Sequence, residues 1–168
     1  MNTLVYHPAF DLYHCAFRML LVLDEFGNAK VETLRIIDFY LLFPELLKDV
    51  KLPRSMAKYK SMIHEIGDSF EVVSNPKRLF HELYFFQEAA IRSLIAKGVF
   101  EKSKYLEGEL AITQNSLPES LRVAFENSQY KSEKWYRFLL FELGRIPLGG
   151  DSGLKFRTGL MEYRYDLV

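Results

Sequence analysis

The residues best suited to chemistry are four histidines and a single cysteine. His7, Asp11 and His14 lie close together near the N-terminus, and imidazole and carboxylate groups are common ligands of transition metals. However, His7 precedes Pro8 and so lies outside the helix predicted for residues 9–26. The sequence contains neither an HExxH motif nor three ligands at metal-binding spacing. We therefore interpret these histidines as half-buried or interfacial residues and predict no metal site.

Cys15 could act as a nucleophile only in surroundings that stabilise its thiolate. It follows His14 directly on the predicted helix, with Leu12 and Phe17 nearby. These neighbours predict a buried and inert thiol. A lone cysteine also excludes an internal disulfide and a zinc site built from cysteines.

The sequence has no motif that would bind phosphate through a glycine-rich loop. Residues 148–153, LGGDSG, are rich in glycine, but no strand, helix and lysine surround them in the order of a P-loop, so we interpret them as a loop. Asp24 and Glu25 are paired carboxylates at a predicted helix end, where water solvates them. Because no catalytic constellation appears, we predict that the chain is not an enzyme and uses no cofactor.

Length and composition bound the class of protein. A chain of 168 residues, 49% hydrophobic, is long enough for one domain with its own core. Fourteen Phe and ten Tyr exceed what a core of this size should hide, which indicates a partner surface. Equal numbers of basic and acidic residues, 22 of each, argue against a dedicated nucleic-acid binder. The N-terminus does not read as a signal peptide and no apolar run could span a membrane, so we expect a cytoplasmic protein.

Apolar residues at 3–4 spacing predict helices at about 9–26, 31–43, 55–67, 76–97, 117–129 and 132–143. The second of these helices is apolar on nearly every face, apart from Glu32, Thr33, Arg35 and Asp38. A helix of this kind is buried all round. We therefore expect residues 31–43 to form the central helix, followed by a short helix that starts at Pro44.

Residues 99–113 predict a hairpin. Two strand-like segments, VFEKSKY and ELAITQ, follow the helix stop at Gly98 and flank a turn at residues 106–108. Helices followed by a hairpin are the layout of a winged helix-turn-helix. The predicted fold is therefore mainly α with a small β-hairpin, a winged helix-turn-helix-like domain with extra helices. We expect one domain over residues 1–168, with a helical N-terminal region at 1–50, helices plus wing at 51–115, and C-terminal helices and tail at 116–168.

Basic residues near the predicted wing could contact DNA phosphates, which requires positive charge but no base code. The candidates are Arg54, Lys58, Lys60, Lys102 and Lys104. Glutamates at positions 101, 107 and 109 share the wing, so a mixed, solvated face explains the same pattern. We keep both interpretations open.

Three segments resemble the middle component of bacterial ABC-three-component systems, which include the Lamassu-type antiphage systems. They are YHPAFDLYHCAFRML (6–20), LRIIDFYLLFPELL (34–47) and, more loosely, IRSLIAKGVFEKSKY (91–105). The resemblance implies a non-catalytic accessory subunit of an antiviral defence complex. Such a subunit would dock on an SMC/Rad50-like ABC ATPase and couple DNA sensing to a toxic effector protein, in many systems a nuclease. DNA would be contacted only weakly or through the complex.

Aromatic residues near both ends of the chain are the candidate anchors for this partner, because aromatic side chains are enriched in interface cores. They are Tyr6, Phe10, Tyr13, Tyr163 and Tyr165. The last two alternate with charged residues in a tail that could extend along a partner. The alternative function is a winged-helix DNA-binding transcription regulator. The helix before the predicted wing carries only Arg92 and Lys97, which is a weak basis for reading bases.

Overall fold

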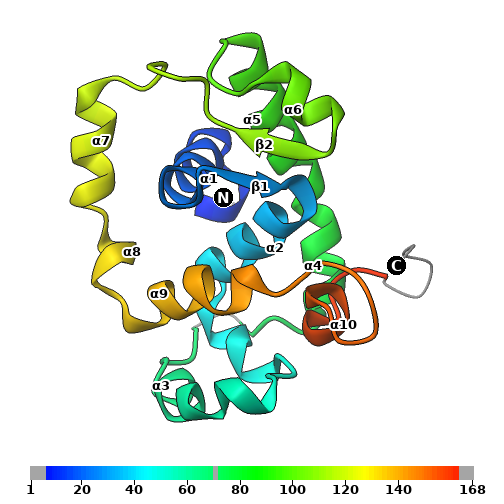
Figure 1. Ribbon diagram of the computed structural model, residues 1–168. Helices are drawn as coiled ribbons and strands as arrows, with labels where there is room; N and C mark the ends of the chain where they lie inside the picture. The colour runs from blue at the N-terminus through cyan, green and yellow to red at the C-terminus, as the bar shows by residue number, and fades with distance from the viewer. Residues whose placement is uncertain (1–6, 70–71, 163–168) are drawn as a thin grey trace, which may run out of the picture.

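The computed structural model describes residues 7–69 and 72–162 and shows a mainly helical protein with one small sheet (Figure 1). The N-terminal elements are η1 (Pro8–Phe10), α1 (Leu12–Phe26), β1 (Asn28–Lys30), α2 (Val31–Leu42), η2 (Pro44–Asp49), η3 (Arg54–Tyr59) and α3 (Lys60–His64). Then come α4 (Pro76–Glu82), α5 (Tyr84–Ala96), α6 (Lys102–Leu106), β2 (Glu109–Ala111), α7 (Glu119–Glu126), α8 (Gln129–Ser132), α9 (Lys134–Phe141), η4 (Leu143–Arg145) and α10 (Leu154–Thr158).

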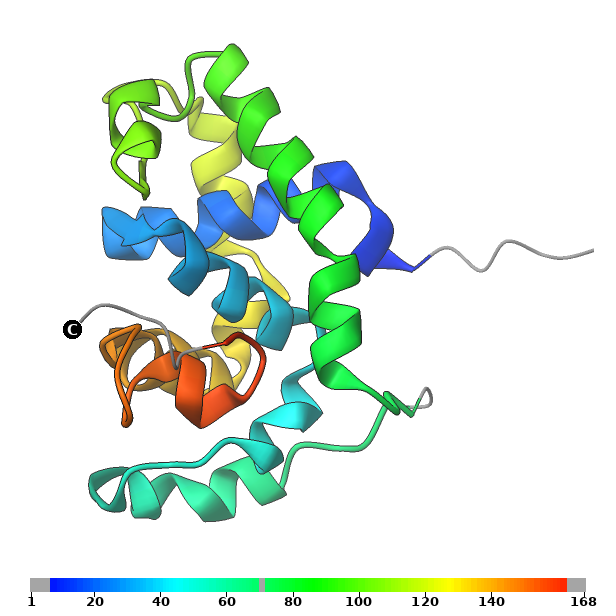
Figure 2. The same ribbon diagram turned by 90° about the vertical axis from the view of Figure 1, so that its right-hand side faces the viewer.

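Helix α2 forms the centre of the core. Every residue from Thr33 to Leu41 is buried, which confirms the prediction of a central helix. Helices α1 and α9 pack against it, and α5 reaches it through Gln87 (Figures 1 and 2). Ile37 and Leu41, one turn apart, are 1% and 3% exposed.

Local capping explains where several helices begin and end. The Asp11 carboxylate accepts a hydrogen bond from the His14 amide, which caps α1, and Gly27 ends that helix with a φ of 77°. Asn75 caps α4 in the same way. The helix predicted at 76–97 is divided at Leu83 into α4 and α5, whereas that predicted at 55–67 is a 3₁₀ turn followed by a short α-helix.

The predicted hairpin at 99–113 is wrong in its first strand and in its pairing. Residues 102–106 form α6, and β2 pairs antiparallel with β1, with Ala29 opposite Leu110. Phe100 and Ile112 still form a single antiparallel bridge. The lysines and leucine of α6 are good helix formers, and the buried side chains of Phe100 and Leu110 fix the ends of the segment in the core. The winged helix-turn-helix assignment is accordingly not confirmed.

The C-terminal region also differs from the expected pattern. The helix predicted at 117–129 is shorter, because α7 begins after Pro118 and ends at Glu126. The glycine-rich loop is fixed by two backbone hydrogen bonds, from the Leu154 amide to the Pro147 carbonyl at 2.8 Å and from the Lys155 amide to the Leu148 carbonyl at 3.1 Å. The short helix α10, which the sequence did not predict, follows it. Within the described ranges, none of the helices combines the length and apolarity needed to cross a membrane.

Candidate partner-binding surface

A buried ion pair joins α1 to α2 beneath the N-terminal surface. The Arg18 Nε donates a hydrogen bond to Asp38 Oδ1 at 2.6 Å, and the two residues are 2% and 1% exposed. Arg18 Nη1 also lies 3.4 Å from the carbonyl of Pro8 in η1. Burial alone would lower the pKa of Arg18, but the charge and hydrogen bonds of Asp38 outweigh it and raise that pKa. The guanidinium therefore stays charged and ties η1 to the core.

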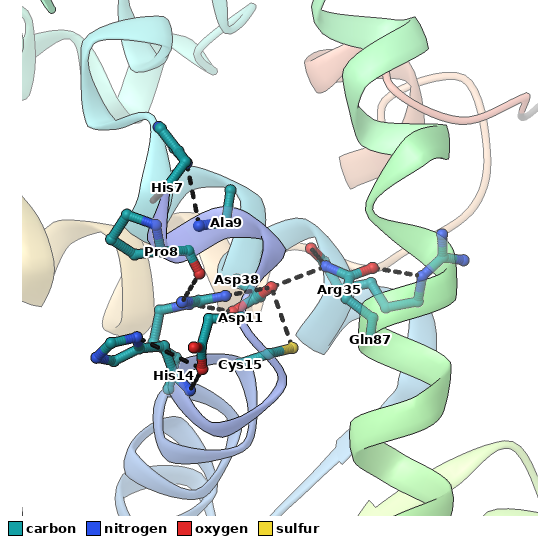
Figure 3. A network of polar contacts seen from close by, with 10 residues as sticks. His7, Pro8, Ala9, Asp11, His14, Cys15, Arg35, Asp38 and Gln87 are labelled. Carbon is teal, nitrogen blue, oxygen red and sulfur yellow. Dashed lines mark hydrogen bonds and ion pairs between the residues drawn. The ribbon is translucent and has the colours of Figure 1, made fainter. Parts of the chain in front are cut away.

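Gln87 extends this network from α2 to α5 (Figure 3). Its Nε2 donates to Asp38 Oδ2 at 2.9 Å and to the Arg35 carbonyl at 3.2 Å. Its Oε1 accepts a hydrogen bond from Arg35 Nε at 2.9 Å. The side-chain amide of Gln87 thus forms hydrogen bonds with both Arg35 and Asp38 of α2. These bonds fix the position of α5 relative to the central helix.

Arg35 lies between two aromatic rings at the edge of this network. Its guanidinium carbon is 4.9 Å from the Phe80 ring centroid and 4.6 Å from the Tyr84 ring centroid. Both distances suit cation–π contact. The network therefore positions two parts of the surface. Arg35 holds the Tyr84 side chain at the start of α5, and Arg18 holds the 3₁₀ turn η1.

Cys15 borders the network, and its surroundings match the predicted inert thiol. The sulfur is 4.0 Å from Asp38 Oδ2, and the residue is 1% exposed. Burial, and next the Asp38 charge, raise the pKa of the thiol. A protonated and covered thiol is a poor nucleophile.

We expect iodoacetamide to label Cys15 in the folded protein at pH 8 about 100-fold more slowly than in the urea-unfolded chain, because labelling requires an opening of the core. Mass spectrometry of quenched samples measures both rates, and free cysteine added to each reaction corrects for the effect of urea on the reagent. Equal rates in the two states would show that the thiol is accessible.

The residues considered as metal ligands have structural contacts instead. His7 Nδ1 accepts a hydrogen bond from the Ala9 amide at 3.1 Å, and its ring stacks on Phe43. His14 Nδ1 lies 3.6 Å from the Asp11 carboxylate, which also caps α1. His64 and His81 lie exposed on α3 and α4. Across residues 7–69 and 72–162, no three His, Cys, Asp or Glu side chains gather closely enough to hold a metal ion.

Four aromatic residues are exposed on η1, α1 and α5, which pack together at the N-terminal side of the molecule. We call them the aromatic patch: Phe10, Tyr13, Tyr84 and Phe85, which are 46%, 81%, 42% and 76% exposed. Phe10 also joins η1 to α5, because its ring lies 5.4 Å from the ring of Phe86 in an edge-on contact. Figure 2 shows the N-terminal turn beside the α4–α5 junction. Because exposed aromatic side chains are common at interaction sites, the patch is the candidate partner surface.

A cleft adjoins the aromatic patch. It has a volume of about 710 Å³, and both apolar and charged side chains line it. Phe10 belongs to the patch and to the cleft wall, and Val72, 92% exposed, also lines the cleft. The remaining walls come from His7, Phe43, residues 73–75, Arg78, Leu79 and Glu82. The patch and cleft together offer anchors and a recess to a partner.

Of the predicted partner residues, Phe10 and Tyr13 lie in the aromatic patch, whereas Tyr6, Tyr163 and Tyr165 fall outside the described residues. Tyr84 and Phe85 are patch residues that the sequence analysis missed. Both lie inside the helix predicted at 76–97, and nothing in its apolar spacing marks them as exposed. The network residues Arg18 and Gln87 were missed because nothing in their local pattern points to a distant partner.

The five basic candidates do not form one surface. Arg54, Lys58 and Lys60 lie exposed on η3 and α3, at the lower end of the molecule in Figure 1. Lys102 and Lys104 lie on α6, at the upper end, and Lys104 pairs with Glu107 at 3.5 Å. The five basic residues therefore form two separate groups and do not form the single DNA-contacting surface that the predicted wing implied.

The structure thus has four exposed aromatic side chains over a buried core, and residues 7–69 and 72–162 contain no cluster of His, Cys, Asp or Glu that could hold a metal ion. A family model, ABC-three component (ABC-3C) system Middle Component 5, matches residues 4–166. No curated protein and no solved structure matches the chain. Middle components of these systems are accessory subunits, which agrees with the predicted class of protein. Since the match spans nearly the whole chain, the protein belongs to the middle component 5 family of ABC-three-component systems.

Proposed function

We propose that the chain is a non-catalytic accessory subunit of an antiviral defence complex of the Lamassu type. In this proposal it docks on an SMC/Rad50-like ABC ATPase and couples DNA sensing to a toxic effector. The observation that carries the docking step is the aromatic patch. Its four side chains are exposed, whereas the other aromatic residues in the described ranges 7–69 and 72–162 are largely covered. Interface hot spots are enriched in aromatic residues.

Two contacts that hold parts of the patch against the core support the same function. Arg18 holds η1 through the Pro8 carbonyl, and Arg35 stacks on Tyr84, so buried charges fix both sides of the surface. A surface that is ordered before binding loses less side-chain entropy on association. We therefore place the ATPase on the patch, with the cleft receiving a projecting side chain or loop. Tyr6, Tyr163 and Tyr165 remain candidate anchors in this proposal.

The test is co-purification of the ABC ATPase of the same three-component system with wild-type chain and single variants. We expect Phe85→Ala and Tyr13→Ala each to weaken binding about thirtyfold, because a hot-spot truncation costs about 2 kcal/mol. Val123→Ala is the matched control, since Val123 is 51% exposed and lies on α7, which carries no patch residue. Affinities measured by biolayer interferometry and melting temperatures of each variant complete the comparison. Equal retention of the ATPase by wild type and both patch variants would contradict docking on this surface.

A subsidiary element of the proposal concerns DNA. Although the winged-helix topology is not confirmed, the two basic groups remain candidates for contact with phosphates in the assembled complex. We expect Arg54→Glu with Lys58→Glu to weaken DNA binding by the complex evenly across sequences and to flatten its salt dependence. Lys102→Glu with Lys104→Glu tests the other end. Fluorescence anisotropy at several salt concentrations measures both, and unchanged slopes for both pairs would remove this chain from the DNA contact.

A further inference from the structure

Arg35 is a buried cation that has no counter-ion in the described part of the chain. The residue is 8% exposed, and across residues 7–69 and 72–162 it forms no ion pair. Its Nε donates a hydrogen bond to Gln87 Oε1 at 2.9 Å, which is an uncharged acceptor. Buried charges are normally paired, because removing an ion from water is costly. Arg35 therefore lacks the partner that a buried cation usually has.

The carboxylates near Arg35 are each paired with another cation. Three of them are close enough for their charges to act on its guanidinium. They are Glu32, which pairs with Lys155 at 3.4 Å, Asp38, which pairs with Arg18 at 2.6 Å, and Glu88, which pairs with Arg92 at 2.8 Å. The charge of Arg35 is therefore left over when these pairs are made.

The two arginines of the polar network differ in how well their charge is stabilised. Burial lowers the pKa of Arg35, and the charges around it offset this only in part. Burial acts on Arg18 in the same direction, but Asp38 outweighs it and raises the pKa of that residue. Since arginine stays protonated in proteins, the guanidinium of Arg35 remains a charge that a carboxylate would stabilise.

The terminal nitrogens of Arg35 are still accessible from outside. Figure 3 shows the guanidinium end of the side chain directed away from Asp38. Both terminal nitrogens form no hydrogen bond with a described residue. Within the described ranges, the fully buried side-chain atoms that lack a partner belong to Glu45, Ser116 and Tyr136 and not to Arg35. Its terminal nitrogens therefore contact solvent.

Aromatic rings border this accessible end. The guanidinium carbon lies 4.9 Å from the ring centroid of Phe80, which is buried, and 4.6 Å from that of Tyr84, which belongs to the aromatic patch. A guanidinium presents its N–H groups as a planar fork that matches the two oxygens of a carboxylate. A partner that covers Tyr84 would also exclude water from Arg35, which strengthens such a hydrogen-bonded pair.

We propose that Arg35 binds an aspartate or glutamate side chain of the protein that docks on the aromatic patch. This inference rests on the proposed docking function and adds the chemistry of the partner, an acidic side chain beside the residues that cover Tyr84. A carboxylate suits the site better than DNA does. The site offers one cation for one anion, whereas a line of phosphates requires several cations and would meet the carboxylates of Glu32 and Glu88.

The first measurement is the affinity of the full chain for the ABC ATPase of the same system, by biolayer interferometry. Arg35→Met keeps an unbranched apolar side chain but removes the charge. We expect it to weaken binding by about thirtyfold or more, because it leaves the partner's carboxylate buried without a counter-ion. Arg122→Met is the matched control. Arg122 lies on α7 and already pairs with Asp24 at 3.3 Å, so its loss should change the affinity by less than about twofold.

A second variant separates contact with the partner from support of the core. Arg35→Lys keeps the charge and introduces an amine, which a carbodiimide joins to a carboxylate in direct contact with it. We expect binding stronger than that of Arg35→Met, together with a cross-link from position 35 to an aspartate or glutamate of the ATPase. Mass spectrometry of the digested complex identifies the cross-link. The wild-type chain, which has no amine at this position, should not form it.

The outcomes distinguish this inference from the docking function. If Phe85→Ala weakens the complex and Arg35→Met does not, docking on the patch stands and the carboxylate pair is wrong. If neither variant weakens it, or if the wild-type chain recovers no ATPase, both proposals are wrong. Loss of DNA binding by Arg35→Met in fluorescence anisotropy, with unchanged affinity for the ATPase, would overturn the pair in favour of a phosphate. If Arg35→Met unfolds in a thermal melt, the cross-link of Arg35→Lys decides, and its absence would overturn the proposal.

Discussion

Replacing Asp38 with alanine should lower the free energy of unfolding by about 3–5 kcal/mol, because it leaves the Arg18 guanidinium buried without its counter-ion. Arg18 is 2% exposed, and its remaining contact in the network is a 3.4 Å approach to the Pro8 carbonyl. Gln87 Nε2 would also lose an acceptor at 2.9 Å. Urea unfolding followed by circular dichroism measures the loss.

The double variant Arg18→Met, Asp38→Leu separates loss of the pair from loss of packing. Removing both charges should recover much of the stability, since a buried ion pair is often no better than apolar residues of similar size. Asp151→Ala, at an exposed position in the glycine-rich loop, is the control and should change stability by less than about 0.5 kcal/mol. A loss below about 1 kcal/mol in Asp38→Ala would mean that water reaches the site.

Replacing Ile37 with alanine should cost about 2–5 kcal/mol, because the lost methyl groups leave a cavity that the core cannot fill. Ile37 is 1% exposed, and its Cδ1 lies close to Gly144 in η4, so the surrounding backbone is already tightly packed. The matched control is Val123→Ala, on a residue that is 51% exposed. If Ile37→Ala and Val123→Ala both had the melting temperature of the wild type, the central position of α2 would be contradicted.

The position of α2 could be predicted from sequence because burial on every face leaves a local signature. A run of apolar residues from Leu34 to Leu41 cannot be satisfied at a surface. The same run contains Arg35 and Asp38, and the sequence shows only that they interrupt the pattern. Their partners come from α1 and α5, so the network depends on tertiary packing that periodicity does not report.

The pairing of the two strands could not be predicted from the sequence for a related reason. β1 has only three residues, between a helix stop and the start of α2, which is too short for an alternating pattern. Its partner β2 lies far along the chain, so the neighbouring segment at 99–105 looked like the obvious strand partner. Phe100 does form a bridge, but the following residues have helix propensity and become α6.

The aromatic surplus of the composition predicted a partner surface but could not locate all of it. Phe10 and Tyr13 were selected because they lie near the N-terminus, and both are exposed. Tyr84 and Phe85 were not selected, because exposure at the start of α5 depends on the division of the helix at Leu83. Which aromatic residues face solvent is decided by how α4, α5 and η1 pack, and composition contains no such information.

The central position of α2 also has a consequence for synthesis on the ribosome. Of the helices that cover α2, α1 precedes it, whereas α5 and α9 emerge later, and Phe141 lies about 100 residues after Leu42. At about 5–20 residues per second, an apolar helix remains uncovered for roughly 5–20 s while the chain elongates. Ribosome-associated chaperones are therefore expected to engage the nascent chain until α9 has left the exit tunnel. Slower elongation would lengthen this interval and favour aggregation.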